Sequence, residues 1–155
     1  MKYFKHLGVM LFAFSALYAQ NALAEPVEIT QILQSTQAWN DTPLPGFQSG
    51  QTDLRVVTFK IEPGAKTSTH LHPVNGAGYV LSGELTMYAT TDTQGNFSDP
   101  KKVKKVVLRA GDAWTEAVDT WHYGENDGKT DVNFLVVFAG TTGTPSTLSL
   151  QNAKK

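Results

Sequence analysis

Three histidines are the residues of this sequence best suited to chemistry. His70 and His72 are separated by one residue, and His122 lies far downstream. Side chains two positions apart in a strand project from the same face, so an extended segment would present the first two imidazoles as a pair of metal ligands. Burying three imidazoles together costs desolvation, and below pH ~6.5 it adds charge repulsion. A shared divalent ion removes both costs, so the pattern favours a metal site.

The alternative interpretation keeps the three histidines apart. In it, the first two form a surface pair on either side of Leu71, and His122 is an unrelated side chain packed by Trp121 and Tyr123. The spacing by itself leaves both interpretations open.

Glu116 is the candidate carboxylate of such a site. It precedes His122 by an even number of residues, so in an uninterrupted strand it would share the face of the histidine, although a turn near Ala117 would break that parity. Three roles stay open for it: a fourth metal ligand, a hydrogen-bond partner of an imidazole, or a general base. A carboxylate on the rim without a role is the fourth option. Further polar candidates, supported only by proximity, are Asn75 and Tyr123.

The elements that must position these side chains have the pattern of β-structure. Short β-branched and aromatic runs recur, separated by turn residues such as Gly, Asn, Asp and Pro. Turn signals at this spacing favour an antiparallel sandwich or barrel over βαβ units. Residues 28–38 suit a short helix or a strand equally well. We expect strands at residues 54–61, 79–81, 85–90, 103–108, 113–117 and 132–139.

Composition narrows the classes of protein and of site. The chain has 155 residues, 41% of them hydrophobic, which is enough for one domain with its own core. Its 13 Lys+Arg against 14 Asp+Glu argue against a nucleic-acid partner, which requires a concentrated basic surface. The absence of cysteine excludes a disulfide framework, a thiolate metal site and a cysteine nucleophile. Metal or acid–base chemistry therefore falls mainly to His, Asp, Glu and Tyr.

Residues 1–24 are expected to be a secretory signal peptide. Lys2 and Lys5 precede an apolar run at residues 7–19, and Ala22 and Ala24 supply the small residues that a signal peptidase reads. The run is shorter than the ~20 residues that a spanning helix needs. No cysteine follows it, which excludes a lipoprotein anchor. We therefore expect a mature protein that is periplasmic or secreted and has no membrane partner.

Two segments resemble the motifs of the cupin superfamily. The first motif is matched by Gly64, His70, His72, Gly76 and Gly83, and the second by Gly111, His122 and Asn126. The resemblance implies an all-β, single-domain cupin jelly-roll barrel, a double-stranded β-helix, whose mouth holds a metal. It places an N-terminal segment at residues 25–53, the cupin domain at 54–140 and a C-terminal tail at 141–155, which we expect to be loosely attached.

The sequence departs from the cupin pattern at three positions. The pattern has a metal-binding Glu where this chain has Gly76, and Pro and Gly where it has Ala117 and Asp119. The first departure leaves a three-histidine site, a variant that also occurs in thiol and diketone dioxygenases of the superfamily. Three neutral imidazoles leave a divalent ion its full charge and open coordination positions. A Gly76→Glu substitution is therefore expected to tighten metal binding by restoring the fourth ligand.

The resemblance implies two classes of function. One is a dioxygenase-like or other small-molecule metalloenzyme that uses a divalent ion (Fe, Zn, Mn or Ni) held by His70, His72 and His122, with Glu116 as the candidate catalytic residue. The other is a non-catalytic module that binds or senses a small ligand or the metal itself. A metal-free binder of carbohydrate or another small molecule follows if the histidines point apart. In each case the expected partner is a small molecule in the barrel, and a homodimer is left open.

Overall fold

The computed structural model describes residues 27–150 of the chain. The predicted signal peptide and the last residues of the predicted tail lie outside this range. The chain divides into two units, Met1–Thr30 and Gln31–Lys155. Of the first unit only residues 27–30 are described, and they are exposed and form neither helix nor strand. All elements below belong to the second unit.

The described part of the chain is built almost entirely from β-strands. Residues 28–38, for which sequence left a helix or a strand open, form neither. No helix within residues 27–150 combines the length and apolar character needed to cross a bilayer. The elements are β1 Thr52–Ile61, β2 His70–Leu71, β3 Asn75–Ser82, β4 Glu84–Thr90, the 3-10 helix η1 Pro100–Lys102, β5 Val103–Arg109, β6 Ala113–Thr115, β7 His122–Glu125, β8 Val132–Thr141 and β9 Leu148–Ser149.

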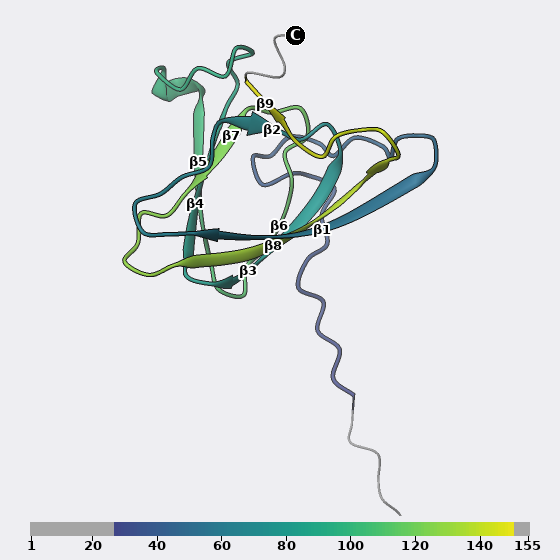
Figure 1. Cartoon of the computed structure of the whole chain (residues 1–155), viewed down its shortest axis with the longest axis horizontal. Coiled ribbons are helices and arrows are strands. Elements are labelled where there is room, and N and C mark those ends of the chain that lie inside the picture. Colours follow the sequence, from purple (N-terminus) through teal and green to yellow (C-terminus); the bar gives the residue numbers. More distant parts are fainter. Residues whose placement is uncertain (1–26, 151–155) are drawn as a thin grey trace, which may run out of the picture. The chain divides into compact units, whose positions relative to one another are not determined.

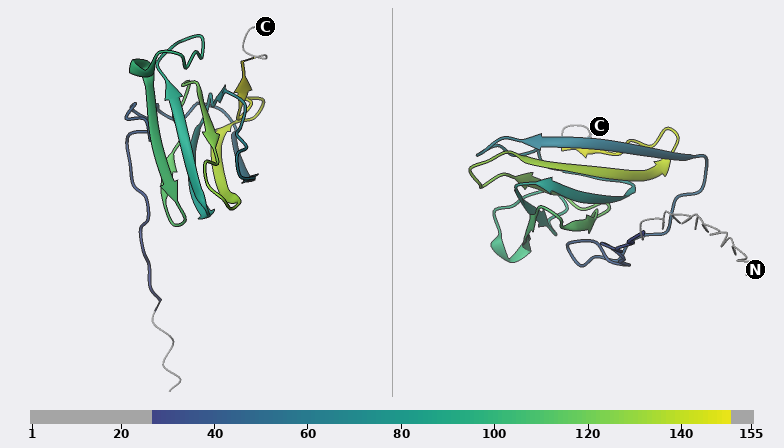
Figure 2. Two further views of the ribbon diagram at one scale, coloured as in Figure 1. Left: turned by 90° about the vertical axis from the view of Figure 1, so that its left-hand side faces the viewer. Right: turned by 90° about the horizontal axis from the view of Figure 1, so that it is seen from below.

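The strands form two sheets that face each other (Figure 1). One sheet has the order β1-β8-β3-β6 and the other β5-β4-β7-β2-β9, and the named strand pairs are antiparallel. Figure 2 shows β5, β4 and β7 side by side in its left panel and β1, β8 and β3 in its right panel. The expected all-β jelly-roll fold is confirmed.

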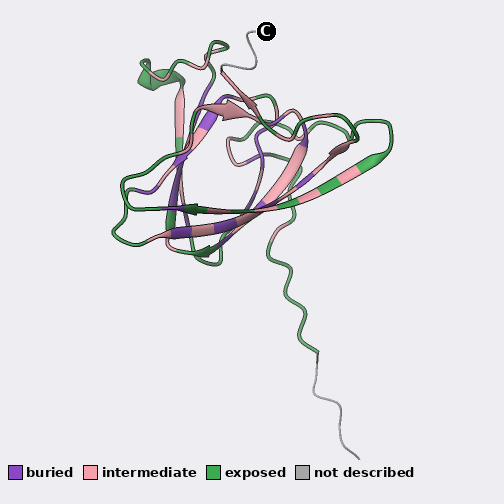
Figure 3. Ribbon diagram, in the orientation of Figure 1, coloured by how far each residue is buried: buried purple, intermediate pink, exposed green. Residues whose placement is uncertain are grey.

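Strict alternation along β8 shows why this sequence folds as a two-layer β-structure. Val132, Phe134, Val136 and Phe138 are buried, and the residues between them are half-buried. A period of two places the buried set on the inner face of the sheet, where it packs with residues of the facing sheet. Figure 3 shows the same alternation of buried and half-buried segments along the strand. Trp114, Phe134 and Phe138 are buried in the apolar core.

The strands that carry the histidines are short and were not predicted. β2 has two residues and β7 has four, too few for a periodic pattern. The C-terminal segment was expected to be loosely attached, and here the structure differs. β9 pairs with β2, placing Ser149 opposite His70 and Leu148 opposite Leu71. The end of the described chain is therefore part of the sheet that holds the histidines.

Candidate metal centre

Pairing between short strands brings the three histidines together. His70 in β2 lies directly opposite His122 in β7 in the antiparallel register. His72 follows β2 and forms a single parallel bridge with Val118, in the connection that leads to β7. Each imidazole is thus positioned by backbone pairing on at least one side.

The three rings converge on one small volume. One ligand atom from each of His70, His72 and His122 can be chosen so that all three lie within 4.8 Å of one another. The ring centroids are 4.5 Å apart for His70 and His122, 4.9 Å for His72 and His122, and 5.0 Å for His70 and His72. His72 and His122 are buried, whereas His70 is half-buried. The approach to the cluster is therefore more open on the side of His70.

Backbone carbonyls fix which ring nitrogen of each imidazole carries the proton. The Nδ1 atoms of His70, His72 and His122 lie 2.6, 2.7 and 2.8 Å from the carbonyl oxygens of Ser68, Ser146 and Thr120. A carbonyl oxygen only accepts, so each Nδ1–H donates and each Nε2 keeps an unshared electron pair. Histidines that bind metals typically donate their second ring N–H in this way.

Burial keeps two of these rings neutral. Desolvation, together with the neighbouring His70, lowers the pKa of His72 to about 4. Desolvation also lowers the pKa of His122 to about 4, against the opposing effect of Glu116. Neutral imidazoles are the form that binds a metal ion.

Glu116 enters the same volume from the end of β6. Its Oε1 accepts a hydrogen bond of 3.0 Å from the indole Nε1–H of Trp114. Its Oε2 is buried and has no hydrogen-bond partner among the described residues, and it lies 3.9 Å from His122 Nε2 and 4.0 Å from His72 Nε2. Burial raises the pKa of Glu116, and His122 opposes that rise. The predicted turn follows the carboxylate, since Asp119 has a φ of 53°.

This donor set fits a divalent cation. The Nε2 atoms and Glu116 Oε2 present unshared electron pairs toward one another, with no protein hydrogen-bond donor reaching Oε2 among the described residues. Two donors that share an ion at ~2.1 Å lie at most ~4.2 Å apart. The distances from Glu116 Oε2 to His72 and His122 meet this upper limit, whereas donors around a tetrahedral ion lie ~3.4 Å apart. The carboxylate and the imidazoles, whose ligand atoms lie within 4.8 Å of one another, would therefore move closer together around an ion.

The cavity around these atoms is small and mostly apolar. Its volume is about 40 Å³. Among the described residues that line it, Glu116 is the one carboxylate. The lining residues are Phe59, Thr67, His70, His72, Leu85, Met87, Trp114, Glu116, His122, Gly124, Phe134, Val136 and Phe138.

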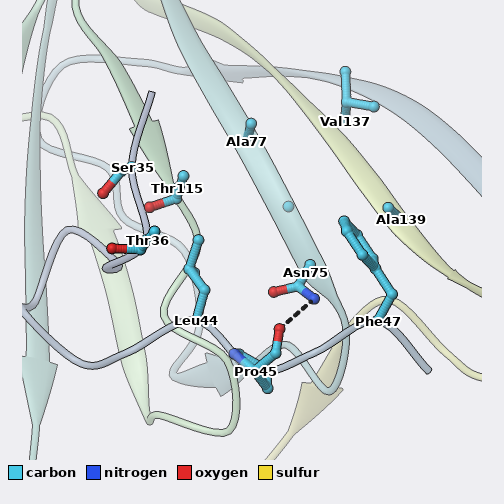
Figure 4. A pocket seen from close by; sticks show the side chains of 11 residues that line it. Ser35, Thr36, Leu44, Pro45, Phe47, Asn75, Ala77, Thr115, Val137 and Ala139 are labelled. Carbon is cyan, nitrogen blue, oxygen red and sulfur yellow. Dashed lines mark hydrogen bonds between the residues drawn. The ribbon is translucent and has the colours of Figure 1, made fainter. Parts of the chain in front are cut away.

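The other polar candidates lie elsewhere. Asn75 points to the face of β3 that is turned away from the histidines, where its amide donates a hydrogen bond of 3.2 Å to the carbonyl of Pro45 (Figure 4). There it lines an apolar groove of about 450 Å³ between the sheet and the N-terminal segment. Tyr123 stacks on Tyr88, with ring centroids 4.9 Å apart. Alternation along β7 places Tyr123 on the face opposite to His122. Neither residue lines the cavity of the histidines.

Sequence reasoning missed the residues that hold the candidate ligands in place. Trp114 is a buried core residue, and its indole also orients Glu116. The signal was present in the sequence, because residues two apart in a strand share a face. Trp39 lies edge-to-face against His122, with ring centroids 6.2 Å apart. The carbonyl of Ser146 had no signal, since it comes from a segment expected to be loose.

The expectation for Gly76→Glu is corrected by the structure. A Cβ at Gly76 would lie 2.9 Å from Glu116 Cγ and 3.0 Å from Phe138 Cδ1. A side chain there must displace its neighbours before it can act as a ligand. The single substitution is therefore not expected to tighten metal binding.

Comparison with known proteins gives a family and a fold. The family model for the Cupin domain matches residues 57–138. No curated protein sequence matches the chain. Among solved structures, the chain is similar to Lactobacillus farciminis oxalate decarboxylase in a formate complex, with a TM-score of 0.52 and 24% identity over 68% of this chain and 29% of that one.

Two further solved structures are similar over comparable parts of the chain. An oxalate oxidase gives a TM-score of 0.49 and 25% identity over 62% of this chain and 45% of that one. A Bacillus subtilis oxalate decarboxylase, studied for its Mn(II) centres, gives a TM-score of 0.49 and 28% identity over 66% of this chain and 24% of that one. The chain thus spans less than half the length of each of these proteins.

Proposed function

The chain belongs to the cupin family, and from this premise we propose that it binds a divalent metal ion through His70, His72 and His122 inside the barrel. One observation carries the proposal. All three Nδ1–H groups are committed to backbone carbonyls, so three Nε2 electron pairs are left facing one small volume. Glu116 Oε2 lies beside them, buried and with no hydrogen-bond partner among the described residues, which is costly unless an ion balances it.

The cavity limits what else can bind beside the metal. A volume of about 40 Å³ holds only a few water-sized groups, since one water needs ~10–15 Å³ by the same kind of measure. A larger ligand would therefore enter with one or two donor atoms only. We propose a small molecule with an oxygen or sulfur donor as the partner, approaching on the side of the half-buried His70.

The proposed chemistry is metal-dependent. A divalent ion would act there as a Lewis acid toward the donor atom of the ligand, and a redox-active ion would add oxygen chemistry. The chain itself contributes the orientation of the three rings, the apolar walls that exclude water, and Glu116. Because Glu116 is the one carboxylate among the described lining residues, we propose it as the catalytic residue.

A second candidate function is a non-catalytic module that binds or senses the metal or a small ligand. The observation that favours it is the size of the cavity, because a volume of about 40 Å³ leaves little room for a reacting molecule. The two functions share the metal site and differ only in turnover, because one fold hosts both enzymes and binders.

Metal titration followed by an activity screen tests this proposal. Residues 25–155 are titrated with Fe(II), Mn(II), Zn(II) and Ni(II) in separate anaerobic experiments, beside a His72→Ala variant. We expect one ion per chain in the unaltered protein and none in the variant, with the same far-ultraviolet circular dichroism. Equal metal content in both would contradict the ligand assignment.

Oxygen uptake separates the two functions. Each loaded form is screened against phenolic, thiol and diketone compounds. Turnover that is lost in Glu116→Gln supports an enzyme. Stoichiometric ligand binding without turnover supports the binding module.

Export remains a proposal from the sequence. The pattern at residues 1–24 supports it, and it predicts a mature chain that begins at Glu25. N-terminal sequencing of the protein recovered from the periplasm or medium of a bacterial host tests it. A chain that keeps Met1 and stays in the cytoplasm would contradict it.

A further inference from the structure

Two glycines of β3 lie opposite two large side chains at β6. The antiparallel register pairs Gly78 with Trp114 and Ala77 with Thr115. One position further, the backbone N–H of Glu116 donates a hydrogen bond of 2.9 Å to the carbonyl of Gly76. Gly76 therefore lies opposite Glu116, just as Gly78 lies opposite Trp114.

The glycines leave the space that these two side chains fill. A Cβ at Gly78 would lie 2.1, 2.3 and 2.4 Å from three atoms of the Trp114 ring. A Cβ at Gly76 would lie 2.9 Å from Glu116 Cγ. Neither glycine has a positive φ, so space rather than backbone conformation explains them.

This packing holds one carboxylate oxygen toward the histidines. The Trp114 indole lies over Gly78 and donates its N–H to Glu116 Oε1. The second oxygen, Oε2, is left buried and unpartnered among the described residues, and it faces the Nε2 atoms of His72 and His122. A carboxylate buried in this way requires a cation or a donor to balance it.

We propose that Glu116 is the carboxylate donor to the metal ion, delivered from the end of β6, and that Gly76 is the residue that makes this delivery possible. The proposal rests on the metal site proposed above and deepens it by naming a fourth ligand. Positions 76 and 116 compete for one volume on the inner face. A carboxylate can therefore reach the ion from one of these two positions, but not from both at once.

Titrations with Co(II) and Zn(II) test the proposal. Co(II) is used because its visible absorption depends on its ligands. Glu116→Gln keeps the shape of the side chain and should weaken metal binding by about tenfold or more, with an altered Co(II) spectrum. Gly76→Ala keeps the carboxylate of Glu116, but its added Cβ displaces that side chain. This variant should therefore also weaken metal binding. The matched control is Glu84→Gln, which neutralises an exposed carboxylate that pairs with Arg109 at 3.0 Å.

Exchange of the two positions gives the sharpest comparison. The double variant Gly76→Glu with Glu116→Gly should bind metal about tenfold more tightly than Glu116→Gly alone, because the carboxylate returns from the opposite strand into the same volume. If the double variant binds metal no more tightly than Glu116→Gly, the inference that positions 76 and 116 share one volume is overturned. A Glu116→Gln protein that folds and matches the affinity and Co(II) spectrum of the unaltered chain would overturn the ligand role.

The results also separate this inference from the metal site itself. An unaltered chain that binds no metal, or a His70→Ala variant that binds it equally well, would overturn the proposed function. Loss of binding in His70→Ala together with unchanged binding in Glu116→Gln would overturn only the role of Glu116.

Discussion

Trp114→Phe is the substitution that best separates support of the metal site from support of the core. Trp114 and Trp121 are both buried, and each indole N–H donates one hydrogen bond. The acceptor is Glu116 Oε1 at 3.0 Å for Trp114, but the neutral carbonyl of Thr93 at 3.1 Å for Trp121. Trp121→Phe is therefore a matched control, because it removes the same atoms from a tryptophan that does not line the metal-binding cavity.

The expected effects differ in kind as well as in size. A hydrogen bond to a charged group contributes about 1.5–3 kcal/mol and one between neutral groups about 0.5–1.5 kcal/mol. The loss of indole volume adds a similar cost to both variants. Trp114→Phe should therefore lower the free energy of unfolding by about 1 kcal/mol more than Trp121→Phe. It should also weaken metal binding by about 10–100-fold, the usual effect of losing a partner that orients a ligand.

Two assays measure these effects on the same protein preparations. Urea denaturation in the presence of a chelator gives the free energy of unfolding, and isothermal titration with Zn(II) gives the dissociation constant. Trp121→Phe should bind Zn(II) within about twofold of the unaltered chain, because its hydrogen bond lies outside the metal-binding cavity. Equal dissociation constants for Trp114→Phe and Trp121→Phe would refute the idea that the indole of Trp114 holds the carboxylate in place.

Three further predictions follow from the same geometry. In metal-free protein, the free energy of unfolding should fall as the pH is lowered from about 7 to about 4.5, because His72 and His122 take up protons near pH 6.5 when unfolded but only near 4 when folded. The free energy of unfolding is measured by urea denaturation in the Glu116→Gln variant, because the Glu116 carboxyl group would otherwise oppose the lowering of the His122 pKa. A free energy of unfolding that rises on acidification would contradict the prediction. Gly78→Ala should lower the free energy of unfolding by about 1–3 kcal/mol or more, because its Cβ overlaps the facing indole. The control Gly46→Ala, whose Cβ meets nothing within 4 Å, should change the free energy of unfolding by less than about 0.5 kcal/mol. Similar values for both variants would refute the packing of Gly78 against Trp114. Free Zn(II) at 100 times its dissociation constant should raise the free energy of unfolding by about 2.7 kcal/mol, and a chelator should reverse this; an unchanged urea midpoint would count against a site in the folded chain.

The fold was predictable because β-branched and aromatic runs recur along the chain and are separated by turn residues. The strands expected at residues 132–139 and 54–61 match β8 and β1, which pair with each other in the structure. Turn residues between the runs indicated an antiparallel arrangement, and this is what the sheets show. The strands that carry the histidines escaped prediction because two to four residues cannot display a period.

The candidate site was only partly predictable. Spacing singled out the three histidines and raised Glu116, but it left open whether they meet. Their convergence depends on the pairing of β2 with β7, a contact between distant segments that no local pattern specifies. Gly76 was interpreted as a missing ligand, because it was unknown that Glu116, just after β6, lies opposite it. The same holds for Ser146, whose carbonyl accepts a hydrogen bond from His72 and which lies in the tail that was expected to be loosely attached.

Anomalous X-ray diffraction from crystals of the protein grown with Zn(II) tests the central claim most directly. Maps from data collected on either side of the zinc absorption edge locate the ion without assumptions about its ligands. We predict one peak inside the barrel, about 2.0–2.2 Å from the Nε2 atoms of His70, His72 and His122. An ion bound outside the barrel, or a barrel without an anomalous peak under conditions in which the protein binds Zn(II), would contradict the account.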